Sequence, residues 1–156
     1  MNPEIVVSYN YKYLIRQDAI SYMQGHIINL HISYLPWNKG SDPNFWSFID
    51  NTPKGVTIHR VDMGLDTGEI LCKKLVDFDE EQETFRTSYE KLNREITVMF
   101  TENWIAIKNN TVKVEKQEGS GTYHTKRDFK KFTELYPINW DENVAEYKRK
   151  IAQVKL

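Results

Sequence analysis

The start of the chain carries the pattern that most restricts its fold: a strand, a helix and a second strand in close succession. Ile5–Tyr9 is a short β-branched run that ends at a polar loop, as buried parallel strands do. Residues 13–24 have a weak helical pattern that Gly25 ends as a C-cap glycine would. The apolar run His26–His31 follows. A crossover of this length joins parallel strands, so we expect an α/β fold with a mostly parallel sheet and helices on both faces.

The middle of the chain adds a loop-rich segment, two strands and a long helix. Residues 33–55 are rich in Pro and Gly, and the aromatic run Phe45–Phe48 within them predicts a short helix. Val56–Val61 alternates as a strand does, and Ile70–Phe78 predicts its antiparallel return after a Gly-flanked turn. Apolar residues at helical spacing then predict a helix from Thr84 onward, carried by Phe85, Tyr89, Leu92, Ile96 and Met99.

Beyond Trp104 the pattern changes to that of a small extension docked on the core. We expect a short strand at Thr111–Val114, a tight turn at Gly119–Gly121 and then a mixed-charge segment. A final helix is predicted from about Asp141, with one apolar face formed by Val144, Tyr147, Ile151 and Val154.

Composition limits the class of protein. A chain of 156 residues fits one domain, and 21 Lys and Arg against 22 Asp and Glu leave a net charge of −1. Such a balance lacks the basic excess of phosphate-backbone binding, so we expect no nucleic-acid partner. Cys72 is the one cysteine, and no apolar run approaches the ~18 residues of a membrane span. We therefore expect a cytoplasmic protein without a disulfide framework, a secretory signal or a membrane segment.

Three polar residues could carry chemistry. Asn29 and His31 are two residues apart in a predicted strand, so their side chains leave the same face. Two unpaired polar groups on a buried sheet would each cost about 1–3 kcal/mol, which indicates partners or a cavity there. Asp66, in a Gly-flanked turn, would raise the imidazole pKa if it lay near His31. An amide donor, an imidazole and a carboxylate suit acyl or formyl transfer. Singly, they could also be a core histidine, a turn asparagine and a turn aspartate.

The remaining motifs are less specific. His26, His59 and His124 lack zinc-ligand spacing, so no metal site is expected. The Gly119–Gly121 run is too short for a dinucleotide or phosphate loop, although Tyr123 and His124 beside it could face a ligand. Four aromatic residues are read as core rather than as a ligand platform: Trp37, Phe45, Trp46 and Phe48.

Three stretches between residues 28 and 68 closely resemble the folate-dependent formyltransferases. They are Ile28-Asn29-Leu30-His31-Ile32-Ser33-Tyr34-Leu35-Pro36, Lys54-Gly55-Val56-Thr57-Ile58-His59 and Asp62-Met63-Gly64-Leu65-Asp66-Thr67-Gly68. Residues 37–46 and 121–128 are most similar to the sugar N-formyltransferases that act on nucleotide-linked amino sugars. The resemblance implies a formyltransferase-like, Rossmann-like fold.

The same resemblance implies substrates and residue roles. The donor would be 10-formyltetrahydrofolate, used without a metal, and the acceptor the amine of a dTDP-linked 4-amino-4,6-dideoxy sugar. The family's catalytic residues fall on Asn29, His31 and Asp66, with a protonated His31 and Asn29 holding the oxyanion. The folate would contact Tyr9, Asn10, Tyr11, Tyr13, Leu14, Val61, Asp62, Met63 and Gly64. The sugar nucleotide would contact Ser33, Trp37 and Tyr123.

The chain also departs from the family. The strand and helix units that precede the segment matching Ile5 are not found, on the order of 70 residues at ~30 per unit. We therefore expect residues 1–114 to be the C-terminal part of a formyltransferase catalytic domain, truncated at its N-terminus, and residues 115–156 to be the docked extension. Ile5–Tyr9 would be an unpaired edge, which a second subunit of a homodimer could cover.

Three other functions remain open. Methionyl-tRNA formyltransferases usually carry a further tRNA-binding domain, which is not evident here. Glycinamide ribonucleotide formyltransferase is less favoured, because its phosphate-binding loop would lie in the missing part. The third alternative is a non-catalytic remnant that binds folate but no acceptor.

Overall fold

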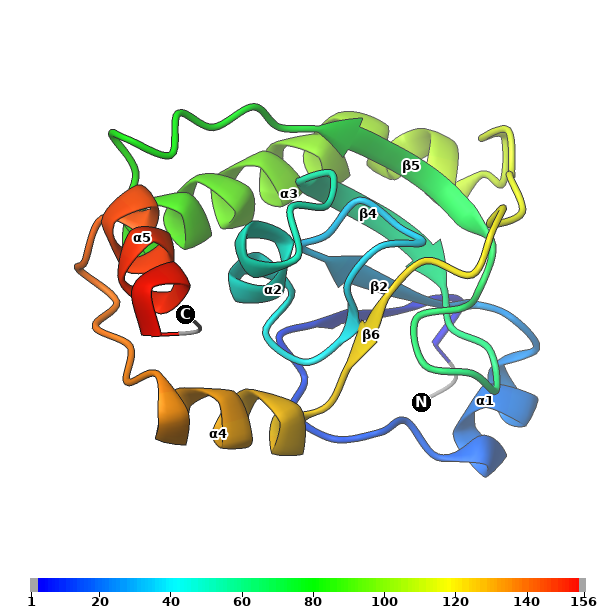
Figure 1. Cartoon of the computed structure of the whole chain (residues 1–156). Helices are drawn as coiled ribbons and strands as arrows, with labels where there is room; N and C mark the ends of the chain where they lie inside the picture. Colours follow the sequence, from blue (N-terminus) through cyan, green and yellow to red (C-terminus); the bar gives the residue numbers. More distant parts are fainter. Residues whose placement is uncertain (1–2, 155–156) are drawn as a thin grey trace.

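The computed structural model describes residues 3–154, in which helices pack around one central sheet (Figure 1). Four strands form this sheet, in the spatial order β1 (Val6–Tyr9), β2 (Ile27–His31), β4 (Gly55–Arg60) and β5 (Ile70–Leu75). A second, two-stranded sheet pairs β3 (Lys39–Gly40) with β6 (Tyr123–His124). The helices are α1 (Gln17–Met23), α2 (Pro43–Ile49), α3 (Phe85–Lys108), α4 (Lys126–Leu135) and α5 (Val144–Val154).

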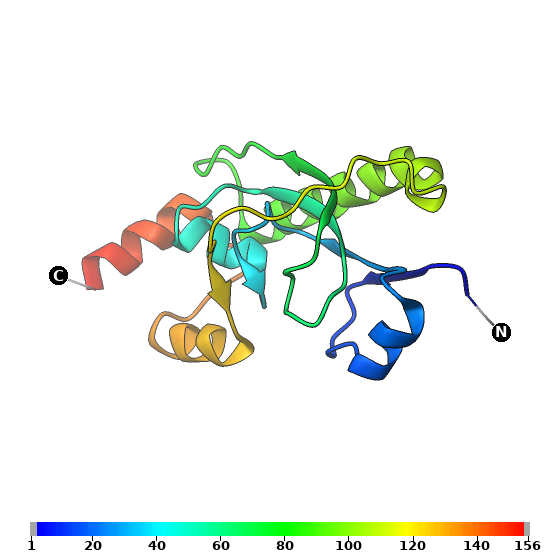
Figure 2. The same ribbon diagram turned by 90° about the vertical axis from the view of Figure 1, so that its right-hand side faces the viewer.

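The strand pairings confirm the predicted crossover and refine the sheet. β1 and β2 are parallel and α1 joins them, as the start of the sequence predicts. β3 and β6 are also parallel. The β2–β4 and β4–β5 pairings are antiparallel. Within residues 3–154 the central sheet is therefore mixed, since β1 and β2 run parallel while β4 runs antiparallel to both β2 and β5. Figure 2 shows α3 on one side of the sheet and α1 and α4 on the other.

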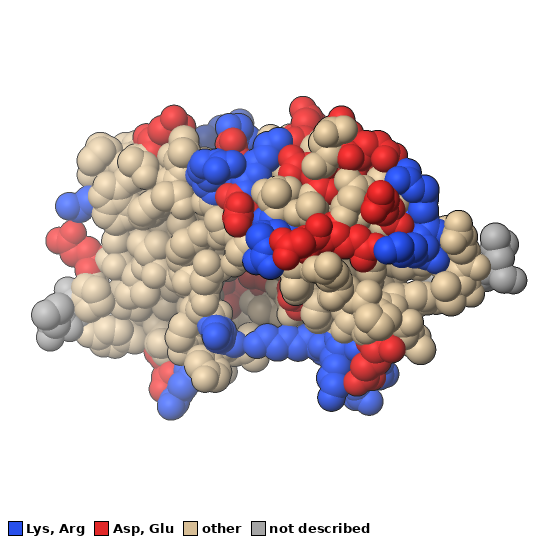
Figure 3. All heavy atoms as spheres, turned by 90° about the vertical axis from the view of Figure 1, so that its left-hand side faces the viewer, with Lys and Arg blue, Asp and Glu red and all other residues tan. Residues whose placement is uncertain are grey.

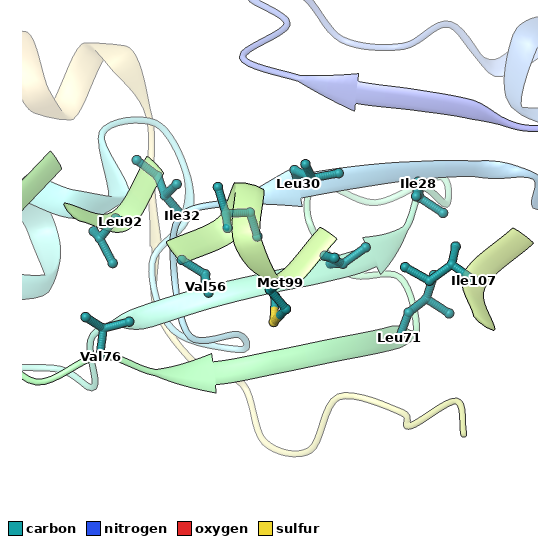
Figure 4. Packing of buried hydrophobic residues seen from close by; sticks show 11 residues of the cluster. Ile28, Leu30, Ile32, Val56, Leu71, Val76, Leu92, Met99 and Ile107 are labelled. Carbon is teal, nitrogen blue, oxygen red and sulfur yellow. The ribbon is translucent and has the colours of Figure 1, made fainter. Parts of the chain in front are cut away.

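The main core lies between α3 and the sheet. Alternate residues of β2 and β4 turn one face toward α3, while Asn29 and His31 leave the opposite face. Figure 4 shows apolar side chains of α3 lying over those of the strands. The buried members of this cluster are Ile28, Leu30, Ile32, Val56, Ile58, Leu71, Val76, Leu92, Ile96, Met99 and Ile107. Thr84 caps the helix reciprocally with Thr87, which fixes where α3 begins.

A second apolar cluster docks the C-terminal extension. Phe129 and Phe132 of α4 pack against this cluster. Its buried members come from α2, the start of α3 and α5 and are Phe45, Trp46, Phe48, Phe85, Val144, Tyr147 and Ile151. Phe45 is fully buried and its ring meets those of Phe85 and Phe129 at centroid distances of 5.4 and 5.1 Å. The expectation that Phe45, Trp46 and Phe48 belong to the core is confirmed.

The structure adds to or departs from the expectations for the extension in three places. Thr111–Val114 is not a strand; Val112 and Val114 instead pack against the main core as an irregular segment. The mixed-charge segment forms α4, which Thr125 and Asp128 cap reciprocally. Val154 does not share the buried face of α5, because the helix leaves the core there and the residue is 70% exposed.

The edge of the sheet at β1 is open within residues 3–154. β1 hydrogen-bonds to β2 on one side, and its residues alternate between partly buried and exposed. None of the helices between residues 3 and 154 combines the length and the apolar character needed to cross a membrane.

Candidate functional site

The structure brings Asn29, His31 and Asp66 together on the face of the sheet away from α3. Asn29 and His31 project from β2, and Asp66 reaches them from the turn between β4 and β5. Asp66 adopts a positive φ of 52°, in the left-handed region that non-glycine residues rarely occupy. The backbone amide of Gly40 donates to Asp66 Oδ2 over 2.8 Å and holds the carboxylate in place.

The distances within this group are those of a connected polar site. Asn29 Nδ2 donates to Asp66 Oδ1 over 3.4 Å. His31 Nε2 lies 3.8 Å from Asp66 Oδ2, and the two side chains are only 8% and 10% exposed. The convergence expected from the sequence is therefore present: a carboxamide, an imidazole and a carboxylate within reach of one small volume.

A fourth residue, His59, belongs to this group and was not predicted. The antiparallel register pairs Asn29 with His59 across the sheet, and His59 is 2% exposed. Its Nδ1 lies 2.8 Å from the Arg60 carbonyl, which can only accept, so Nδ1 carries a proton. Its Nε2 lies 3.3 Å from Asn29 Nδ2 and 3.4 Å from Asp66 Oδ1. His59 thus contacts both the amide and the carboxylate of the group.

The tautomer of His31 is set by a backbone carbonyl. His31 Nε2 lies 3.1 Å from the oxygen of Asn38, so the neutral ring carries its proton on Nε2. Burial lowers the pKa of His31, and although the Asp66 carboxylate and the Asn38 carbonyl both act to raise it, the pKa stays below its ordinary value. As expected from the sequence, the Asp66 carboxylate acts to raise the pKa of this imidazole, but the ring is 7% exposed and its desolvation outweighs that effect.

Asp66 is the ionised member of the pair. Burial alone would raise the pKa of its carboxyl, but His31, His59 and the Gly40 amide outweigh burial and hold that pKa well below its ordinary value. The site therefore presents a carboxylate beside a neutral imidazole, together with one amide that can donate a hydrogen bond.

The two loops expected to hold folate expose apolar groups in the structure. After β1, Tyr11 is 59% exposed and Tyr13 and Leu14 are each 75% exposed, while Tyr9 donates to Asn93 Oδ1. In the other loop, Met63 is 60% exposed, and Asp62 accepts from Gly64 and Thr67. Both loops lie on the side of the molecule away from α3 (Figure 2). Exposed aromatic and thioether groups of this kind are available to contact a flat, largely apolar ligand.

The residues expected to contact the sugar nucleotide lie in different settings. Ser33 is 2% exposed, and its hydroxyl donates to the Trp37 carbonyl over 2.5 Å. Tyr123, on β6, is 53% exposed.

Figure 3 shows that the face carrying α4 and α5 is hollowed near its middle, with Lys and Arg side chains along one margin. Within residues 3–154 the structure has no cluster of three or more His, Cys, Asp or Glu side chains that could hold a metal ion.

Comparison with known proteins identifies the class that this fold and site define. Residues 1–102 match the Formyl transferase family, and the chain belongs to that family. Among solved structures, the formyltransferase PseJ from Anoxybacillus kamchatkensis is 44% identical, with a TM-score of 0.87 over 94% of this chain and 77% of that one. It was solved with UDP-4,6-dideoxy-4-formamido-L-AltNAc and tetrahydrofolate. A 4-N formyltransferase from Francisella tularensis is 27% identical, with a TM-score of 0.77 over 89% of this chain and 55% of that one.

The curated relatives are named for a different acceptor. A methionyl-tRNA formyltransferase from Rickettsia massiliae is 32% identical over 155 residues, which are 97% of this chain and 48% of that protein. One from Caldanaerobacter subterraneus is 29% identical over 119 residues, or 76% of this chain and 38% of that protein. The chain thus spans about half the length, or less, of these curated relatives.

Proposed function

We propose that this protein transfers a formyl group from 10-formyltetrahydrofolate to the amine of a nucleotide-linked 4-amino-4,6-dideoxy sugar. The observation that carries the proposal is the convergence of Asn29, His31 and Asp66 at one end of β2. Membership of the Formyl transferase family supports the reaction class. The tetrahydrofolate bound to the structure that is 44% identical supports the donor.

The geometry of the site supports the following residue roles. The acceptor amine attacks the formyl carbon, a C–N bond forms, and the formyl oxygen gains negative charge. Asn29 is partly exposed and donates through Nδ2, so its amide is suited to stabilise that oxyanion. The tetrahedral intermediate then collapses, the bond from carbon to the folate nitrogen breaks, and tetrahydrofolate leaves.

A neutral His31 acts as the base in this scheme. Its Nε2 is committed to the Asn38 carbonyl, and no hydrogen bond within residues 3–154 engages its Nδ1. Nδ1 can therefore take the proton that the attacking amine loses and return it to the departing folate nitrogen. The Asp66 carboxylate, 3.8 Å from the ring, stabilises the imidazolium formed in between.

Two ligand regions complete the proposal. The folate pterin lies against Tyr9–Leu14 and Val61–Gly64, whose exposed apolar side chains it covers. The sugar nucleotide approaches near Ser33, Trp37 and Tyr123, with the exposed Tyr123 ring available to stack on a base. We favour UDP over dTDP as the carrier, because the structure that is 44% identical was solved with a UDP-linked 4-formamido sugar.

Methionyl-tRNA is the second candidate acceptor, since a curated relative that is 32% identical carries that activity in its name. The net charge of −1 argues against it, because binding of a nucleic-acid backbone usually needs an excess of basic residues.

The test is a direct competition between acceptors. The purified chain is incubated with 10-formyltetrahydrofolate and, in separate reactions, a UDP-linked 4-amino-4,6-dideoxy sugar, its dTDP counterpart and methionyl-tRNA. Mass spectrometry of each acceptor measures formylation, and calorimetry measures folate binding. Formylation of the UDP-sugar fastest of the three supports the proposal. Formylation of methionyl-tRNA alone, or folate binding without any transfer, refutes it.

A further inference from the structure

One segment of the C-terminal extension connects the two loops that carry the site. We define residues 115–124 as the strap. At one end, Glu115 exchanges backbone hydrogen bonds of 2.7 and 2.9 Å with Ile70, just after the turn that bears Asp66. At the other end, β6 pairs with β3, so that His124 lies opposite Gly40. The strap thus crosses from the Asp66 turn to the loop that holds Asn38 and Gly40.

The first anchor in the strap is Gln117. Its Nε2 donates to the backbone oxygen of Asp66 over 2.8 Å and to that of Gly68 over 2.9 Å. These two bonds clamp the turn at the residue whose φ of 52° lies in the left-handed region. The Oε1 of Gln117 is buried and has no partner among the described residues. The side chain is therefore committed to the two carbonyls of the turn.

The second anchor is Thr122. Its hydroxyl accepts from the Asn38 backbone amide over 2.8 Å and donates to Asn38 Oδ1 over 3.2 Å. Asn38 is 1% exposed, has a positive φ of 54°, and presents its carbonyl to His31 Nε2 at 3.1 Å. Thr122 therefore fixes the residue that selects the His31 tautomer.

Gly121 allows the strap to approach this closely. A Cβ at Gly121 would lie 1.8 Å from the backbone oxygen of Pro36, and its φ of 62° disfavours any side chain. The contact brings Thr122 against the loop that leads to Asn38.

We propose that Gln117 and Thr122 are positioning residues. Gln117 holds the turn that carries Asp66, and Thr122 holds the Asn38 carbonyl that binds His31, although neither residue touches the reacting groups. Both lie outside residues 1–102, the part that matches the Formyl transferase family. In this proposal the strap supports the catalytic residues through these two anchors, rather than only packing the extension on the core. The kinetic consequence rests on the proposed function; the geometric consequence does not.

Each anchor predicts a distinct result in a nuclear magnetic resonance experiment on the imidazole of His31. In the wild-type chain the ¹⁵N shifts report a proton on Nε2. Thr122→Val, which keeps the shape but removes the hydroxyl, increases the fraction protonated on Nδ1, and Thr122→Ser restores the wild-type tautomer. Gln117→Met frees the Asp66 turn, so the pKa of His31 falls as the carboxylate moves away. Glu118→Gln, an exposed position on the same strap, leaves both signals unchanged.

Steady-state kinetics on the proposed acceptor tests the same anchors. Thr122→Val and Gln117→Met lower kcat by about 10- to 100-fold, as expected for a small displacement of groups around a reacting carbon. The KM for folate and for the sugar nucleotide changes little, since the strap anchors contact neither ligand in this scheme.

The outcomes separate the two proposals. Altered His31 signals in a chain that formylates no acceptor would support the strap and refute the proposed function. Unaltered His31 signals in both variants would refute the positioning role of the strap, whatever the activity. Reduced thermal stability with unchanged His31 signals and unchanged kcat would mean that the strap only packs the extension against the core. That result would also refute its positioning role.

Discussion

Substitution of His59 tests how the site orients its oxyanion donor. His59 is buried and touches Asn29 through Nε2 at 3.3 Å and the Arg60 carbonyl through Nδ1 at 2.8 Å. His59→Asn keeps a donor close to the Nδ1 position and removes the group at the Nε2 position. His59→Gln does the reverse. The pair therefore separates the contact with the site from the contact with the backbone.

The structure sets the expected magnitudes. His59→Asn removes one of the two acceptors of the Asn29 amide and leaves Asp66 Oδ1 as the other, so it costs about 0.5–1.5 kcal/mol for the lost hydrogen bond. His59→Gln loses one hydrogen bond to a backbone carbonyl, which contributes about 0.5–1.5 kcal/mol. Both variants are therefore less stable than the wild type. We expect a kcat about 10- to 100-fold lower in His59→Asn, because Asn29 then keeps only its 3.4 Å bond to Asp66 Oδ1 and its donor is displaced. In His59→Gln we expect a kcat within a few-fold of the wild type.

Urea unfolding measures the loss of stability in each variant, and formyl transfer at saturating substrates measures kcat. The reasoning about Asn29 would be refuted by equal kcat values in the two variants, or by a slower His59→Gln, since either result would place the functional contact at Arg60.

Three further predictions concern stability. Ile96→Ala lowers the free energy of unfolding in urea by about 2–5 kcal/mol, because Ile96 is fully buried in the main core, whereas Val98→Ala, at a position 45% exposed, changes it by less than about 0.5 kcal/mol. Thr84→Ala removes the cap of α3 and lowers the unfolding free energy by about 0.5–2 kcal/mol, and Thr84→Ser retains most of it; an unchanged midpoint for the alanine variant would contradict the capping assignment. Because burial lowers the pKa of His31, the unfolded chain binds more protons just below the ordinary value of 6.5, so stability falls as the pH drops from 6.5, by at most about 1.4 kcal/mol per unit. His31→Gln should flatten this dependence in urea titrations across that range.

Much of the fold could be predicted because local patterns and tertiary contacts agree. The β1–α1–β2 unit and α3 follow from apolar periodicity, and the core uses the same residues that create the periodicity. The helix α4 was missed because charged residues dominate its sequence. Thr125, followed three residues later by Asp128, was the available signal, since the two form a reciprocal cap.

The sequence predicted which three residues meet at the candidate site, but not the protonation state of His31 or the contact with His59. The motifs around Asn29, His31 and Asp66 carried the resemblance to the formyltransferases. His59 was missed because alternation assigns a residue to a face but does not give the register that pairs it with Asn29. The protonation of His31 depends on how completely the loop carrying Asn38 covers it, a property of the tertiary structure that spacing does not encode.

The central claim is that one imidazole in this chain moves the proton of a formyl transfer, and His31→Asn examines it most directly. Single-turnover mixing of 10-formyltetrahydrofolate with the UDP-linked amino sugar follows release of tetrahydrofolate in the wild type and the variant. We predict that the wild-type chain completes the turnover, and that the variant binds folate with similar affinity but shows no measurable release. Release at a rate close to that of the wild type would contradict the account.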